Sequence, residues 1–333
     1  MKIRHDVAAI SSILFTIALL KLAPDMWGDA ALIRASTLYN ESNPLYRVYD
    51  CFAPMGFASL AVIVLGLMVT WAGFIRGVRW TWFVMFVIVC GWAFPVYMLL
   101  YVHYWKHLEV IATFASGIRE SGLARVFVEN VLTFLLMVLA LVLPVKTFFG
   151  GRRGSAGRIE RRNPGAPDKW PRRWTLTSSR DPVAVSSILF TLALLILMPA
   201  MWRAAANLPE SSLWGFSRTT EEWPPDCFAS AGVCSLAVMA IGLIVTWAGY
   251  IRRVRWTWFV MFVIVWVWAF PVLILPYLLP RRGVETMAQS FASAISRGGV
   301  ALAFLLMLLA LLLPFKTLVL GRGVPQAGPS ARM

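Results

Sequence analysis

Charged residues are scarce in this sequence, because Asp, Glu, Lys and Arg make up only 14% of its 333 residues. Soluble domains carry roughly 25%. The shortage is concentrated in apolar runs of about 20 residues, which are typical of membrane-spanning segments. No polar stretch is long enough to form an ordinary soluble enzyme domain, so we expect an integral membrane protein.

Cysteine and histidine are also rare, with 4 and 3 residues. No CxxC pair and no Cys/His spacing suitable for zinc occurs. The P-loop, HExxH, GxSxG and strand–helix GxGxxG motifs are absent as well. We therefore expect no cofactor and no enzymatic activity. Cys90 and Cys234 lie inside apolar runs and are expected to be small buried side chains.

Basic residues outnumber acidic ones and give a formal net charge of +15. Such a charge can indicate a nucleic-acid partner. Here the Lys and Arg residues lie in short loops between apolar runs rather than on one soluble face. We therefore interpret them as determinants of membrane topology and expect no nucleic-acid partner.

One stretch of the sequence occurs twice. Residues 78–89 and residues 254–265 both read VRWTWFVMFVIV. Around them, Asp50–Pro95 and Asp226–Pro271 agree at about three quarters of their positions without a gap. Each copy has an apolar run, a short basic break and a second apolar run, which predicts a helical hairpin in a membrane.

Each copy contains four apolar segments, and 20 to 25 residues at 1.5 Å per residue reach across a hydrocarbon core of about 30 Å. The predicted fold is an all-α integral membrane protein with eight transmembrane helices as two parallel tandem four-helix repeats. The repeats cover residues 1–150 and 181–321, and residues 322–333 form a tail. The segments are Val7–Leu22, Cys51–Ile75, Trp80–Val102, Ala124–Phe149, Val183–Trp202, Cys227–Ile251, Trp256–Leu279 and Val300–Leu320.

The linker between the repeats, residues 151–180, is rich in Gly, Pro and Arg and lacks an apolar period, so we expect it to be disordered. Together with Gly150 it holds nine basic and two acidic residues, a charge of about +7. We expect this linker to bind anionic lipids of the bilayer. The basic residues fall on one side of the predicted helices, which places both termini in the cytoplasm and predicts a multi-pass protein of the cell membrane.

The basic breaks are the strongest candidates for a functional role. Arg76 and Arg79 precede Trp80 in the first copy, and Arg252 and Arg255 lie at the corresponding turn of the second. Arginine beside tryptophan is typical of a membrane-interface anchor. The alternative is that these arginines hold an anionic headgroup or substrate.

Acidic residues occupy matching places before the second segment of each copy. Asp50 and Asp226 are expected at helix starts, where a carboxylate satisfies free N–H groups. An acidic pair at the mouth of a pathway is the alternative. Cys51 and Cys227 follow them, and a bridge requires their Cα atoms to approach within about 7 Å.

Two histidines and two prolines complete the candidate residues. His103 and His107 are four residues apart and share a helix face, which makes them weak metal-site candidates. Pro95 and Pro271 lie inside the third segment of each copy. Each removes a backbone hydrogen bond, so both are hinge candidates.

Polar residues are few at the predicted middle of the membrane. Ser11 and Ser12 match Ser186 and Ser187, and we interpret them as close helix packing rather than an ion path. Lys21 and Glu129 are expected near helix ends. No charged residue is shared by both copies at mid-membrane, which argues against an ion-coupled transporter.

Three classes of function remain. A non-catalytic structural, assembly or interaction role in the membrane agrees best with the lack of catalytic motifs. The main alternative is a transporter or channel for a small or lipid-like solute, with its path between the two repeats. An intramembrane enzyme or redox subunit is a third hypothesis, for which the sequence offers no motif.

Overall fold

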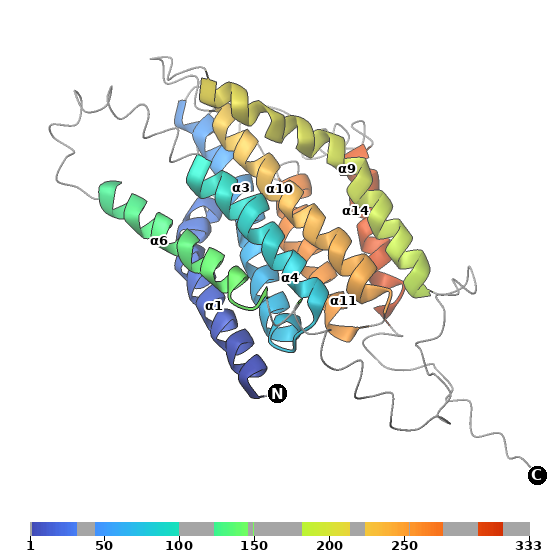
Figure 1. Cartoon of the computed structure of the whole chain (residues 1–333). Coiled ribbons are helices and arrows are strands. Elements are labelled where there is room, and N and C mark those ends of the chain that lie inside the picture. The colour runs from blue at the N-terminus through green and yellow to red at the C-terminus, as the bar shows by residue number, and fades with distance from the viewer. Residues whose placement is uncertain are drawn as a thin grey trace, which may run out of the picture.

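The computed structural model describes residues 2–31, 44–99, 123–145, 149, 182–213, 224–252, 254–275 and 299–315 (Figure 1). Helix is the only regular secondary structure within these ranges. An apolar segment surrounded by lipid must satisfy its own backbone N–H and C=O groups, and a helix does so. The predicted all-helical class is confirmed.

We call residues 1–150 the first half and residues 181–321 the second half. Each η segment is π-helical, with a wider turn than an α-helix, and continues the α-helix before it. In chain order the helices are α1 (Lys2–Ala31), α3 (Pro44–Val69), η1 (Thr70–Phe74), α4 (Arg79–Phe86), η2 (Val87–Leu99), α6 (Leu123–Val142), α9 (Pro182–Leu213), α10 (Pro224–Val245), η3 (Thr246–Tyr250), α11 (Arg255–Val263), η4 (Ile264–Ile274) and α14 (Gly299–Leu312).

Six helices are long and apolar enough to cross a membrane, which supports a membrane protein. They are Val7–Ala31, Ala53–Phe74, Arg79–Val96, Pro182–Ala206, Ser230–Tyr250 and Arg255–Ile274. Two further apolar helices, Glu129–Val142 and Gly299–Leu312, are shorter in the described residues. The second has 14 residues, which cover about 21 Å of a hydrocarbon core of about 30 Å.

Helix ends differ from the predicted ones at α1, at α3, which begins at Pro44, and at α9, which continues to Leu213. Helix α1 continues to Ala31 instead of ending near Leu22, so Asp25 and Asp29 lie in a helix and not in a loop. The far end of α1 packs closely on Gly56 of α3, and such packing supports helical structure beyond the apolar run.

Helices α3 and α10 form the centre of the molecule. They pack against each other, and each also packs extensively on the π-helical segment of the other half, α3 on η4 and α10 on η2. By contrast, α3 makes few contacts with η2 and α10 makes few with η4, although these segments belong to their own halves. The two halves are therefore interlocked at their centre.

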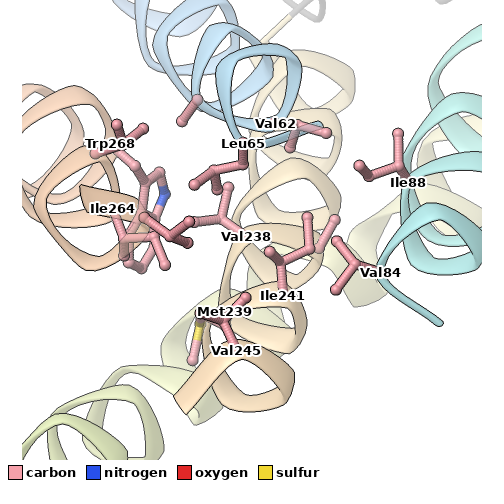
Figure 2. Packing of buried hydrophobic residues seen from close by; sticks show 14 of the residues in the cluster. Val62, Leu65, Val84, Ile88, Val238, Met239, Ile241, Val245, Ile264 and Trp268 are labelled. Carbon is pink, nitrogen blue, oxygen red and sulfur yellow. The ribbon is translucent and has the colours of Figure 1, made fainter. Parts of the chain in front are cut away.

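Buried apolar side chains fill this centre, as Figure 2 shows. Val84 and Ile88 of the first half face Ile241 of α10, while Ile264 and Trp268 of the second half lie on the opposite side of α10 near α3. All five side chains are fully buried. Lipid is as apolar as these side chains, so what they contribute to the contact between the halves is close van der Waals packing.

Glycine allows two pairs of helices to approach closely. A β-carbon at Gly232 in α10 would lie 2.5 Å from the backbone nitrogen of Ala205 in α9. Gly56 in α3 occupies the same kind of place against Ala30 in α1. Small residues at such crossings are typical of helix packing in membranes.

Two buried serines join neighbouring helices by donating to a carbonyl that a proline four residues later leaves without an N–H donor. Pro144 has no N–H, so the carbonyl of Ala140, four residues earlier, receives no hydrogen bond from it. The Ser11 hydroxyl of α1 donates to this carbonyl. Ser186 of α9 donates to the carbonyl of Ala310, which lies four residues before Pro314. Ser11 and Ser186 thus join two helices, as the packing interpretation predicts, whereas Ser12 and Ser187 donate to carbonyls of their own helices.

Candidate functional site

The first basic turn is a compact link between η1 and α4. The N–H groups of Arg76 and Val78 both donate to the carbonyl of Gly73, at 3.2 and 3.1 Å. Gly77 has φ +72°, a conformation that a side chain would strain. The Thr81 hydroxyl donates to the carbonyl of Val78 at 2.5 Å and fixes the start of α4.

The second basic turn repeats these bonds. Val254 N–H donates to the carbonyl of Gly249 at 3.3 Å. Thr257 donates through its hydroxyl to the carbonyl of Val254 at 2.6 Å. Arg255 begins α11, as Arg79 begins α4, and neither helix start has a side-chain cap.

Two tryptophans bring the turns together. The rings of Trp80 and Trp256 stack with their centroids 5.3 Å apart and their planes 14° from parallel. Each ring also lies over the glycine of the other turn. A β-carbon at Gly249 would be 3.0 Å from Trp80 Cζ2, and one at Gly73 would be 3.2 Å from Trp256 Cζ2. Each turn therefore contacts the other through the same pair of residue types, a tryptophan and a glycine, as in a two-fold contact.

The side chains of Arg76, Arg79, Arg252 and Arg255 are exposed around this stack. Because Trp80 and Trp256 stack on each other, the two turns that hold these arginines lie next to each other. Figure 1 shows the beginnings of α4 and α11 at the same end of the bundle as the N-terminus. We define these four arginines with Trp80 and Trp256 as the paired-turn surface.

A second polar group crosses the centre of the bundle. Trp92 Nε1 donates to Ser59 Oγ at 3.3 Å, and Ser59 Oγ lies 3.3 Å from Cys234 Sγ of the other half. In the second half, Trp268 Nε1 donates to Ser235 Oγ at 3.0 Å. All of these side chains are buried. They hold helices together, and the arrangement contains no base or acid that could activate the thiol.

The structure also pairs two charges that the sequence places far apart. Lys21 Nζ of α1 lies 3.3 Å from Glu129 Oε2 of α6, and the two side chains are 40% and 39% exposed. The expectation that Lys21 lies near a helix end is wrong, because α1 continues to Ala31. A charge at mid-membrane costs roughly 2.5–3.5 kcal/mol, and pairing reduces such a cost.

Sequence reasoning missed this pair, although a signal was present. In the second half Ile196 and Gly299 stand at the two corresponding positions, and a β-carbon at Gly299 would lie 3.6 Å from Ile196 Cγ2. Both charges are thus replaced together by apolar groups at the same helix contact. A coupled difference of this kind predicts contact.

The candidate aspartates have different backbone positions. Helix α3 begins at Pro44, so Asp50 lies inside the helix and not at its start. That part of the prediction is wrong for Asp50. Asp226 is the third residue of α10, which begins at Pro224, and a carboxylate there is favourable for the helix dipole. Their side chains lie outside the described residues.

Both hinge candidates lie in π-helical segments, Pro95 in η2 and Pro271 in η4. A proline ring clashes with the carbonyl four residues earlier in an α-helix, and a wider turn gives the ring more room. The hinge role stays a prediction. His103 and His107 lie outside the described residues, as do the side chains of Cys51 and Cys227.

The two described cysteines are both free, and Cys234 is buried as expected. The same expectation is wrong for Cys90, which is exposed. Phe86 and Phe94, four residues on either side, are 45% and 42% exposed. Residues four apart share a helix face, so Cys90 belongs to the outer face of the bundle.

The part of the chain that the structure describes contains no group of three or more His, Cys, Asp or Glu side chains that could hold a metal. Comparison with known protein families, curated proteins and solved structures finds no match for this chain. The paired-turn surface is therefore assessed on its own geometry.

Proposed function

We propose that this chain is a multi-pass protein of the cell membrane with a non-catalytic structural, assembly or interaction role. The observation that carries the proposal is the interlocked centre, in which α3 packs on η4 and α10 on η2. A transport path between the halves requires an opening there. Fully buried apolar side chains, such as Val62, Leu65 and Ile241, occupy this place instead.

The proposed architecture has eight membrane-spanning helices in two parallel tandem four-helix repeats. The length of α6, which has 20 residues, supports a fourth span in the first half. The reciprocal seating of Trp80 over Gly249 and of Trp256 over Gly73 supports two halves with one orientation. Matching hydrogen bonds from Trp71 to Thr16 and from Trp247 to Thr191, both 3.1 Å, support the same arrangement.

The proposed orientation places both termini in the cytoplasm, with the basic linker against anionic lipids. Single cysteines at Ser155 and Ser330, in a background whose native cysteines are replaced, are then expected to resist a membrane-impermeant thiol reagent in intact cells. Single cysteines at Asn40 and Ser211 are expected to react. Labelling of Ser155→Cys by the reagent in intact cells would contradict the proposed orientation.

A cross-link across the centre tests the role itself. Ser59 Oγ and Cys234 Sγ are 3.3 Å apart, so Ser59→Cys and Cys234 are expected to form a disulfide after a small shift. In this variant Cys51, Cys90 and Cys227 are replaced by serine. The protein is purified, reconstituted in vesicles and assayed for flux of small ions, neutral solutes and labelled lipids.

We expect flux equal to that of protein-free vesicles, before and after oxidation. We also expect the chain, gently extracted from its native membrane, to migrate in a complex larger than itself. Saturable flux that is lost on oxidation of the cross-linked variant and restored by reduction would replace this proposal with the transporter alternative.

A further inference from the structure

We propose that the paired-turn surface binds the headgroup of a membrane lipid that carries two phosphates joined by a short linker, the cardiolipin class. The inference rests on the membrane location proposed above but not on the absence of transport. It gives the arginines of the paired-turn surface a ligand, whereas a role as a membrane-interface anchor alone requires none.

The first argument is charge. The 5.3 Å contact between Trp80 and Trp256 joins two turns that together hold four exposed arginines. Arg76, Arg79, Arg252 and Arg255 carry four positive charges at one end of the bundle. Guanidinium groups bind phosphate through two parallel N–H···O bonds, so the complementary ligand is a phosphate-bearing lipid.

The second argument is position. The apolar helices α3 and α10, continued by η1 and η3, lead into these turns, and tryptophan is enriched where a membrane meets water. The indoles of Trp80 and Trp256 stack on each other, and the four arginines of the two turns are exposed. A headgroup phosphate at the membrane surface can reach these arginines while its acyl chains stay beside the apolar helices.

The third argument is symmetry. Each turn supplies the same elements, an exposed Arg-x-x-Arg and a tryptophan over the other turn's glycine. Two adjoining turns that each hold an exposed arginine pair match a ligand with two anionic groups. A lipid with one phosphate can bind the arginines of one turn only. When two phosphates belong to one molecule, binding of the second phosphate to the second turn costs no further translational freedom.

Lipid binding to the purified full-length chain tests the proposal. The protein is titrated in neutral phosphatidylcholine nanodiscs that contain phosphatidylglycerol or cardiolipin at equal total negative charge, and bound lipid is counted by native mass spectrometry. We expect one tightly held cardiolipin per chain, with at least about tenfold preference over phosphatidylglycerol. Equal binding of the two lipids at equal charge would overturn the two-phosphate assignment.

Variants locate the site. Arg79→Gln with Arg255→Gln is expected to weaken cardiolipin binding about thirtyfold, the effect of removing two arginines near an anionic surface. Arg79→Lys with Arg255→Lys keeps the charge and the fold, and is expected to lose about tenfold because lysine cannot form the paired N–H bonds. Unchanged binding in both variants would contradict the proposal.

A charge-matched control distinguishes lipid binding at the paired-turn surface from lipid binding at the basic linker. Arg152→Gln with Arg153→Gln removes the same charge from the linker and is expected to leave the tightly held cardiolipin in place. If this variant loses the lipid and the Arg79/Arg255 variants keep it, the linker is the binding site. The flux assay above is independent of this result, so the two proposals can fail separately.

Discussion

Replacing Gly56 with alanine is expected to destabilise the protein by about 2–3 kcal/mol, and more if the helices cannot separate. The new methyl group would meet the backbone of α1 at Asp29 and Ala30, and backbone atoms cannot move aside as the end of a flexible side chain can. Gly232→Ala is expected to behave in the same way, because its β-carbon would lie 2.5 Å from Ala205 nitrogen.

Gly28 provides the matched control, since no atom lies within 4 Å of the place its β-carbon would take. Gly28→Ala exchanges the same atoms in a helix and is expected to be neutral, or stabilising by up to about 1 kcal/mol through helix propensity. Thermal unfolding of the three purified variants in one detergent measures the difference. Equal unfolding temperatures for Gly56→Ala and Gly28→Ala would show that α1 and α3 do not cross at Gly56.

Replacing Ser11 with alanine is the second large change, with an expected loss of about 1–3 kcal/mol. The carbonyl of Ala140 would then have neither Ser11 nor an N–H from Pro144, and an unsatisfied backbone group is costly where no water reaches it. Ser186→Ala is expected to cost more. Besides its bond to Ala310, Ser186 lies 3.0 Å from the hydroxyl of Tyr250, which would lose this partner.

Ser12→Ala is the control for this prediction. The Ser12 hydroxyl donates to the carbonyl of Ala8 in its own helix, at 2.7 Å, and therefore joins no second helix. We expect a change of less than about 0.5 kcal/mol, measured by the same unfolding assay. If Ser11→Ala is as mild as Ser12→Ala, the link between α1 and the proline-terminated end of α6 contributes nothing measurable to stability.

The positions of helices could be predicted from the sequence, because long apolar runs leave the backbone no other way to satisfy its hydrogen bonds. The tight turns between the second and third helices were also predictable. A short basic break between two apolar runs requires antiparallel neighbours, and the bonds to the Gly73 and Gly249 carbonyls show such turns. Helix ends were predicted less well, since α1 and α3 extend beyond the apolar runs.

Which helices become neighbours was decided by the tertiary structure alone. In a membrane the core and the lipid are both apolar, so a helix such as α14 has no polar face to show which side is buried. The sequence therefore did not reveal that η2 packs on α10 and η4 on α3. For the same reason it did not pair Lys21 with Glu129, nor Ser11 with Ala140. These contacts join residues more than 100 positions apart, and only the packed helices bring them together.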